Sequence, residues 1–404
     1  MSDRPPAFGH PSTLLASWRR RVRQALRRGA QTPFFLFAAE PVADAHARLE
    51  RLRFGRPLRG WFSGKTHPLP AMWRWWRQRQ GSLEVVSEWE FRTARNAGFD
   101  ADHLLVNGPA KHRWLPRLAM ARQRVNFDSP GELAALLAQA RRQRWRTGLR
   151  LRTPVEVDPE HPDRPSQFGM EPSELAAAVG TLRSAGLEPE VLHFHLRTHL
   201  PKPSVLARAM ESAAAVCEAA GWHPPYLNAG GGLAPPFTLD LFGRRFDADL
   251  SPREYATVLR EGWERMPFVR ELWMEHGRYV CAGGGVLALR ILEARHRDGA
   301  RQWICDGGRT LHALVSTWEQ HALIALEPRG GRRVMTSVHG PTCMAFDTLA
   351  RLPMASSLRP GDVLIWLDAG AYHLSWETRF SHDLAEVWWE AEGRLRRVRR
   401  TAAH

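Results

Sequence analysis

The chain has 404 residues, of which 44% are hydrophobic and 25% are charged. This length and composition are typical of a folded protein of two or three domains, and they exclude a mainly disordered chain. The four cysteines form no CxxC pair, which excludes a disulfide scaffold and a zinc ribbon. No apolar run reaches the roughly 18 residues of a membrane helix.

The net charge is +15, and the only lysines are Lys65, Lys111 and Lys202. The arginines are spread along the chain without a basic stripe or an RNA-binding motif, so we favour a solvated basic surface over a nucleic-acid site. No secretory signal pattern precedes the first helix. We therefore expect a cytoplasmic protein that binds neither nucleic acid nor membrane, and any lysine used in chemistry must be one of three.

Residues 1–32 are predicted to be an N-terminal extension, disordered to residue 11 and then forming a basic amphipathic surface helix from Ser12 to about Arg28. Over residues 33–279, short apolar runs alternate with amphipathic stretches, which predicts a (β/α)8 TIM-like barrel. Its strand candidates are Phe34–Ala38, Trp61–Ser63, Leu83–Val86, Leu104–Val106, Arg124–Phe127, Leu149–Arg152, Val191–His195, Tyr226–Ala229 and Leu272–Met274.

Residues 280–404 lose the helical spacing and show strands divided by Gly, Pro and Asp turns. This pattern predicts a second, mainly antiparallel β-sheet or β-barrel domain. Its strand candidates are Val286–Ala294, Gln302–Cys305, His321–Leu326, Arg333–His339, Asp362–Trp366 and Glu386–Trp389.

Barrel enzymes place their sites at the C-terminal ends of the strands. Lys65, Gly230-Gly231-Gly232, Glu275 and Arg278 all follow candidate strands. A lysine there can form a Schiff base, a triple glycine and an arginine can hold a phosphate, and a glutamate can keep a pyridine nitrogen protonated. Together these residues predict a site for pyridoxal 5'-phosphate.

The motifs around these residues resemble those of the fold-type III pyridoxal-phosphate-dependent decarboxylases, the ornithine, diaminopimelate and carboxynorspermidine decarboxylase group. The resemblance runs from about Thr32 to about His382. The matching segments are Gly64-Lys65-Thr66-His67-Pro68, Glu84 to Glu90, Asn107-Gly108-Pro109, Val125 to Ser129, His193-Phe194-His195, Asn228 to Gly232, Glu275-His276-Gly277-Arg278, Gly340-Pro341-Thr342-Cys343 and Asp368 to Tyr372.

The resemblance implies an amino-acid decarboxylase, a carboxy-lyase acting as a homodimer with shared active sites. It implies that His195 stacks on the cofactor ring, that Tyr372 contacts the phosphate, and that Cys343 enters from the second subunit to donate a proton. The implied catalytic residues are Lys65, His195, Cys343 and Glu275. The implied cofactor-binding residues are Lys65, Glu84, His195, Thr198, Gly230, Gly231, Gly232, Glu275, Gly277, Arg278 and Tyr372.

Two departures from the family pattern concern the substrate. Met344 stands where the family has an acid that binds the distal amine, and Arg197 stands where it has glycine. A buried ammonium without a partner costs several kcal/mol, so we expect a substrate whose distal end is neutral, bulky or anionic, with Arg197 as the anion partner. Glu88 or Asp347 could instead replace the missing acid. An acidic substrate, free or on an acidic carrier protein, would also suit the positive surface.

The cluster Trp73-Arg74-Trp75-Trp76-Arg77 follows Lys65 and is open to two interpretations, a cation–π patch at the entrance or plain helix packing.

Three alternative functions remain. His193 and His195 could bind a metal in a hydrolase, together with His199, His223 or His276. A racemase of the same fold type would share the lysine, but Glu275 favours decarboxylation because that reaction needs a strong electron sink. The third alternative is a relative without catalytic activity, and the retained motif residues argue against it.

Overall fold

The computed structural model describes residues 7–161, 166–297, 299–315 and 317–400. The chain divides into two compact units. The barrel unit comprises His46–Ala234 and Asp249–Gly277, and the sheet unit comprises Met1–Ala45, Pro235–Ala248 and Arg278–His404. In the described ranges, no helix combines the length and the apolar character needed to cross a membrane.

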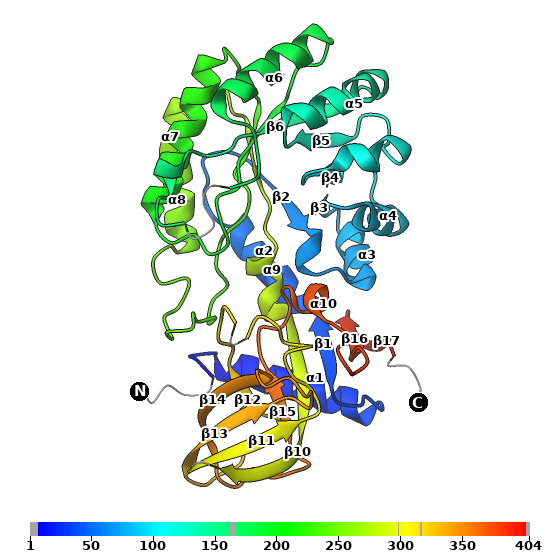
Figure 1. The fold of residues 1–404 in the computed structure, drawn as a ribbon, viewed down its shortest axis with the longest axis vertical. Coiled ribbons are helices and arrows are strands. Elements are labelled where there is room, and N and C mark those ends of the chain that lie inside the picture. The colour runs from blue at the N-terminus through cyan, green and yellow to red at the C-terminus, as the bar shows by residue number, and fades with distance from the viewer. Residues whose placement is uncertain (1–6, 162–165, 298, 316, 401–404) are drawn as a thin grey trace. The chain divides into compact units, whose positions relative to one another are not determined.

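Within the described part of the barrel unit, eight parallel strands close a barrel, which confirms the predicted TIM-like fold (Figure 1). The ring is completed where Leu58 of the first barrel strand pairs with Leu272 of the last. In chain order the strands are β2 (Leu58–Ser63), β3 (Ser82–Val85), β4 (Leu104–Val106), β5 (Arg124–Phe127), β6 (Arg146–Arg150), β7 (Val191–His193), β8 (Tyr226–Asn228) and β9 (Glu271–Met274).

Helices follow most of the barrel strands and surround them. Serine caps begin three of them: Ser87, Ser129 and Ser251 each accept a hydrogen bond from the backbone N–H three residues later. The helices are α3 (Pro70–Gln78), α4 (Glu88–Asn96), α5 (Pro130–Gln143), α6 (Pro172–Ser184), α7 (Pro203–Ala219) and α8 (Pro252–Gly262).

The tryptophan cluster lies on α3 and is mostly packing. Trp73, Trp75 and Trp76 are buried. Trp73 Nε1 donates to His67 O at 2.9 Å, and Trp76 Nε1 donates to Ser82 O at 3.0 Å. These hydrogen bonds connect α3 to the neighbouring backbone. These contacts favour the packing interpretation over a patch at the entrance.

Within the described residues of the sheet unit, a nine-stranded, mostly antiparallel sheet forms. The main path runs β14-β13-β11-β10-β1-β16-β17, while β15 pairs with β10 and β12 pairs with β15. The strands are β1 (Phe34–Ala38), β10 (Gly285–Arg297), β11 (Ala300–Cys305), β12 (Leu323–Ala325), β13 (Arg333–His339), β14 (Thr348–Ala355), β15 (Val363–Trp366), β16 (Glu386–Ala391) and β17 (Arg394–Arg399). The remaining helices are α1 (Ser12–Arg27), α2 (Ala39–Glu50), α9 (Arg278–Cys281) and α10 (His373–Trp376).

Strand β1 belongs to the sheet and not to the barrel, unlike the prediction that placed residues 33–279 together. It pairs antiparallel with β10, Phe34 opposite Ala288, and parallel with β16, Phe34 opposite Glu386. All five of its side chains are buried. A continuously apolar strand is compatible with any central position in a sheet, so its sequence does not reveal its neighbours.

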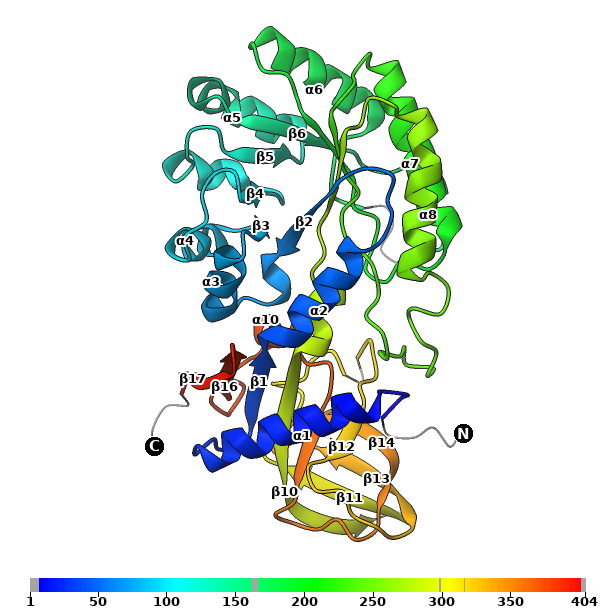
Figure 2. The ribbon, with the colours of Figure 1, turned by 180° about the vertical axis from the view of Figure 1, so that it is seen from behind.

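The N-terminal segment is part of the sheet unit's core, which corrects its interpretation as an extension. Trp18, Val22 and Ala25 of α1 are buried and pack in one cluster with side chains of β1, β10, β12 and β15. Figure 2 shows α1 lying across the sheet strands. The predicted disorder is also wrong for residues 7–11, because buried His10 pairs with Asp368 at 2.8 Å. Residues 1–6 lie outside the described residues.

Candidate active site

Lys65 lies in a short 3-10 turn, Gly64–Thr66, directly after β2. Its Nζ lies 2.8 Å from Ser63 Oγ and 3.0 Å from Glu84 Oε2 at β3, and Ser63 Oγ–H also donates to Glu84 at 2.7 Å. Glu84 is 1% exposed, whereas the Lys65 side chain is 42% exposed. The amine is therefore oriented by a buried carboxylate while remaining accessible.

The other two lysines have different surroundings. Lys111 is fully buried, with its Nζ bonded to Glu132 at 2.6 Å and to Gly108 O. Lys202 pairs with Glu160 at 3.1 Å on the surface. Of the three lysines in the sequence, Lys65 alone combines a barrel strand end with an accessible amine.

Glu275 follows β9 and is held by amides from neighbouring strand ends. Asn228 Nδ2 donates to its Oε1 at 2.8 Å, and Asn107 Nδ2 donates to the same oxygen. Asn126 Nδ2 in turn donates to Asn107 Oδ1 at 2.9 Å, and His193 Nε2 lies 3.2 Å from Glu275. All these side chains are buried. The network fixes a carboxylate at the carboxyl ends of the strands.

The three asparagines were within the quoted motifs but were not predicted as site residues. Their signal was available in the sequence, because each places an amide at or near the end of a buried strand. A buried amide at such a position needs a hydrogen-bond partner, and the next polar strand ends offer one.

The glycine loop after β8 is folded tightly against the segment after β7. The N–H of Gly231 donates to His195 Nδ1 at 3.1 Å. A Cβ on Gly231 would lie 2.5 Å from Glu275 O, and one on Gly232 would lie 2.6 Å from Arg197 O, so only glycine fits at both positions. Gly277 is equally constrained, because its Cβ would lie 2.0 Å from Thr66 Oγ1 beside the lysine turn.

The His195 ring is neutral in this environment. Burial, reinforced by the charges of Arg150 and Lys65, holds the pKa of His195 well below its usual value. Because Nδ1 accepts the Gly231 N–H, the ring proton lies on Nε2. An uncharged, fixed imidazole suits stacking on a planar ring.

Arg197 and Thr198 line a cavity of about 510 Å³ in the barrel unit, together with His195 and Arg150. Arg197 Nη1 lies 3.3 Å from the buried carboxylate of Asp158, and Arg150 Nη1 lies 3.1 Å from Asp128. Thr198 is exposed at the cavity. Two guanidiniums therefore border the space beside His195.

In the sheet unit, Arg278 begins α9 and lies over the ring of Tyr372, 4.6 Å from the guanidinium carbon to the ring centroid. Its Nη1 also pairs with buried Glu319 at 2.7 Å. Cys343 is exposed. The structure thus brings together two of the predicted phosphate ligands, Arg278 and Tyr372, within this unit.

Asp347, a candidate replacement for the missing acid, is buried and binds groups of its own loop and of the segment after β11. Its carboxylate accepts the backbone N–H of Arg309 at 2.8 Å, the backbone N–H of Thr342 at 3.1 Å and the Thr342 hydroxyl at 2.6 Å. Glu88, the other candidate, forms pairs with Arg92 at 2.8 Å and Arg117 at 3.6 Å. Both carboxylates already have partners of their own, and Met344 itself is half-buried.

The histidines proposed for a metal hydrolase do not form a ligand set. Among the residues that the structure describes, the one histidine cluster with metal-ligand spacing is His312, His321 and His373 in the sheet unit, and it includes neither His193 nor His195.

Two family models match the chain. The pyridoxal-dependent decarboxylase pyridoxal-binding domain matches residues 43–282, and the C-terminal sheet domain of the same enzymes matches residues 209–370. This chain belongs to the pyridoxal-dependent decarboxylases. Its cofactor is pyridoxal phosphate, so the family and cofactor predicted from the motifs are confirmed.

Curated relatives of this pyridoxal-dependent decarboxylase include a diaminopimelate decarboxylase of Actinosynnema pretiosum subsp. auranticum, 30% identical over 77% of this chain and 73% of that protein. The L-glutamyl-[BtrI acyl-carrier protein] decarboxylase of Niallia circulans is 26% identical over 87% of this chain and 86% of that protein. A solved structure of diaminopimelate decarboxylase from Helicobacter pylori complexed with L-lysine has the same fold, with a TM-score of 0.80, 20% identity and coverage of 94% and 97%.

The barrel residues of this decarboxylase fit the cofactor. The glycine loop has no room for side chains and keeps its backbone close to His195, while Glu275 is a buried carboxylate held by two amides. A buried anion of this kind is the partner that a protonated pyridine nitrogen requires. Lys65 supplies the accessible amine.

Proposed function

We propose that this enzyme removes the α-carboxylate of an amino acid whose distal end is neutral or anionic, using Lys65 to bind the cofactor covalently. The proposal rests on two features of the same barrel. One is an accessible lysine at a strand end, and the other is the buried carboxylate of Glu275, which amides hold in place. Pyridoxal phosphate supplies, when bound, a sink for the electron pair released as CO2 leaves.

Each predicted cofactor-binding residue has a role in this proposal. Glu275 would hold the proton on the pyridine nitrogen, and Asn107 and Asn228 keep its carboxylate in place. The neutral ring of His195 would hold the cofactor ring and the backbone of Gly230, Gly231 and Gly232 would hold its phosphate, while the motif match assigns Arg278 and Tyr372 to the phosphate as well. Glu84 orients Lys65, and Thr198 and Gly277 complete the cofactor-binding set.

We further propose a homodimer in which the partner subunit's Cys343 delivers, from Sγ, the proton that replaces the carboxylate. This proposal rests on the GPTC motif and is consistent with the exposure of Cys343 on the sheet unit.

The substrate proposal rests on residues that cannot bind a distal ammonium. Met344 offers only a thioether, and Asp347 and Glu88 already have partners of their own. Arg197, with Arg150, borders the cavity beside His195. A guanidinium has five N–H donors, so Arg197 can bind a substrate anion while keeping its contact with Asp158.

A carrier-bound substrate is consistent with the same features. The relative from Niallia circulans is named for an L-glutamyl group on an acyl-carrier protein. The net charge of +15 would favour an acidic carrier. We therefore propose an acidic or uncharged aminoacyl substrate, free or on such a carrier.

Reductive trapping tests the lysine directly. Borohydride treatment of the holoenzyme should fix a pyridoxyl group on the peptide that contains Lys65, and Lys65→Ala should lose the cofactor absorbance and activity together. Lys202→Ala, a surface variant, is the matched control and should retain both. A pyridoxyl adduct on Lys111 or Lys202 would overturn the assignment.

Subunit mixing tests the shared site. Lys65→Ala and Cys343→Ala proteins should each be inactive, and their mixture should recover up to about a quarter of wild-type activity, because half of the dimers then contain one intact site. A mixture that stays inactive after proven subunit exchange would contradict the partner role of Cys343.

A further inference from the structure

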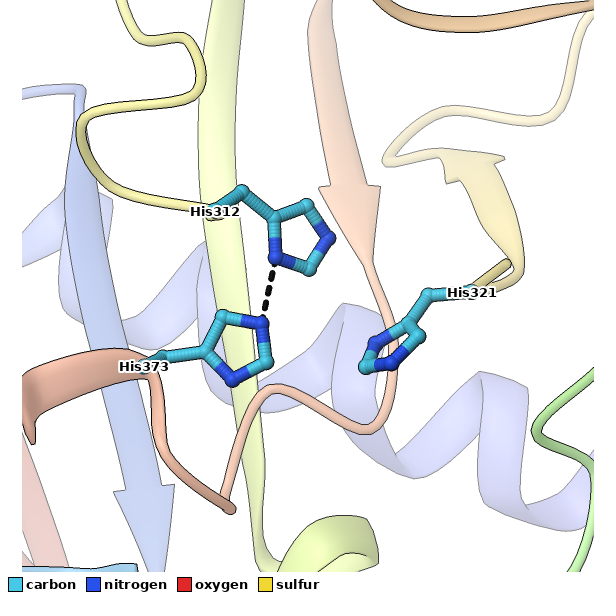
Figure 3. Close-up of side chains that lie close together, drawn as sticks. All are labelled: His312, His321 and His373. Atoms are coloured by element: carbon cyan, nitrogen blue, oxygen red, sulfur yellow. Dashed lines mark hydrogen bonds between the residues drawn. The ribbon is translucent and has the colours of Figure 1, made fainter. Parts of the chain in front are cut away.

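Three buried histidines meet in the sheet unit from segments that are distant in sequence. His312 lies in the connection after β11, His321 lies two residues before β12, and His373 begins α10 (Figure 3). The ring centroids of His312 and His373 are 4.4 Å apart, and His321 lies 5.1 Å from His312 and 5.4 Å from His373. One ring nitrogen from each histidine lies within 4.8 Å of the other two.

Backbone carbonyls fix the tautomers of two of these rings. His373 Nδ1 bonds to Ala371 O at 2.8 Å, and His321 Nδ1 bonds to Leu367 O at 3.1 Å. A carbonyl only accepts hydrogen bonds, so both Nδ1 atoms carry the proton. The Nε2 of His321 then presents a lone pair, and the Nε2 of His373 accepts a hydrogen bond from His312 Nδ1, which a bound metal would replace (Figure 3). Metal-binding histidines use this arrangement, in which a backbone carbonyl orients the ring.

In the described part of the chain, two of the three rings also leave a buried nitrogen without a hydrogen-bond partner. Among the described residues, Nε2 of His312 and Nε2 of His321 have no hydrogen-bond partner, although buried polar atoms nearly always have one.

A buried carboxylate lies beside His321. Glu319 Oε2 is 3.6 Å from His321 Nε2, and its other oxygen accepts a hydrogen bond from Arg278 at 2.7 Å. Glu319 is 2% exposed. Nitrogen and oxygen ligands of tetrahedral zinc lie about 2.0–2.2 Å from the metal, so they are about 3.3 Å from one another. The three histidine nitrogens lie within 4.8 Å of one another, and Glu319 would rotate toward them to complete the site.

We propose that His312, His321 and His373, with Glu319 as fourth ligand, form a structural Zn²⁺ site in the sheet unit. All four side chains are buried, which is typical of closed structural sites and not of catalytic sites that keep a position for substrate. The ion would join the connection after β11, the start of β12 and α10. This inference does not depend on the proposed substrate.

Metal analysis of the full-length holoenzyme tests the proposal. After loading with ZnCl₂ and dialysis against metal-free buffer, the wild type should retain about one zinc ion per chain. His312→Gln and His321→Gln should bind Zn²⁺ at least about tenfold more weakly. His296→Gln and His382→Gln alter exposed histidines of the same unit and should bind as the wild type does. A wild type without retained zinc, or equal retention in all five proteins, would overturn the proposal.

Two measurements on the wild type keep the test decisive if the variants do not fold. Zn²⁺ should raise the thermal unfolding temperature above that of the chelator-treated protein, because an ion that binds only the folded state stabilises it. X-ray absorption at the zinc edge should show imidazole ligands at about 2.0 Å. No stabilisation, or a spectrum without imidazole, would reject the site.

Discussion

The barrel unit and the sheet unit differ in how far apart in sequence their paired strands lie. Along the barrel each strand pairs with the next one in the chain, and only β2 and β9 close the ring over a long separation. In the sheet, β1 pairs with β10 and β16, which lie more than two hundred residues later. Local sequence patterns therefore determine the barrel far more directly than the sheet.

The two units also differ in how they hold chemical groups. The barrel holds Lys65 with the buried carboxylate of Glu84 and holds Glu275 with a network of buried amides, both at strand ends. The sheet unit presents Cys343 on its surface and buries its histidine cluster. We expect changes in the barrel network to alter catalysis and changes in the sheet core to alter stability.

The largest expected effect concerns the barrel network. Glu275→Gln keeps the shape and one acceptor oxygen but removes the charge that holds the pyridine proton, so kcat should fall about a thousandfold while the cofactor stays bound. Steady-state assays with the absorption spectrum of the bound cofactor would measure both. Glu264→Gln, at an exposed position, should have wild-type kcat. A near-normal kcat for Glu275→Gln would remove Glu275 from the mechanism.

The next effect concerns the sheet core. Trp18→Ala should lower the free energy of unfolding by about 3–5 kcal/mol, because it empties a position that is 1% exposed in the core cluster. Phe242→Ala, at a side chain that is 96% exposed, should change it by less than about 0.5 kcal/mol. Urea denaturation would measure both. If the two variants were equally stable, α1 would contribute nothing to the core, and its interpretation as an extension would stand.

A smaller effect links stability to pH. Burial, with a further contribution from the nearby Glu84 charge, raises the pKa of Glu90 from 4.5 to about 7. The unfolded chain therefore loses this proton at lower pH than the folded chain, so the wild type loses stability as pH rises from 4.5 to 7. Glu90→Gln should match the wild type below pH 4.5 and be more stable by about 1–3 kcal/mol at pH 8.

Thermal and urea denaturation at pH 4 and pH 8 would measure that difference. Glu264→Gln again serves as the exposed control and should show no such pH dependence. If Glu90→Gln is less stable than the wild type at pH 8, the charged form of Glu90 is favoured by the fold and the predicted direction is reversed.

The sequence predicted the barrel strands to within a few residues because strand–helix alternation is a local signal. It misplaced β1, because the partners of this strand, β10 and β16, lie far along the chain, and it also missed β14 and β17, which pair with their chain neighbours β13 and β16. The motif residues led directly to Lys65 and Glu275. The amide network of Asn107, Asn126 and Asn228 and the histidine cluster required the fold, since their members meet only in three dimensions.

Substrate preference is the most direct test of the central claim. CO2 release should be measured from L-ornithine, L-lysine, meso-diaminopimelate, L-glutamate and an L-glutamyl thioester on an acidic acyl-carrier protein. The account predicts turnover of an acidic or carrier-bound substrate, lost in Arg197→Ala, and little turnover of the basic amino acids because Met344 cannot pair with a distal ammonium. Efficient turnover of ornithine, lysine or meso-diaminopimelate by the wild type would contradict it.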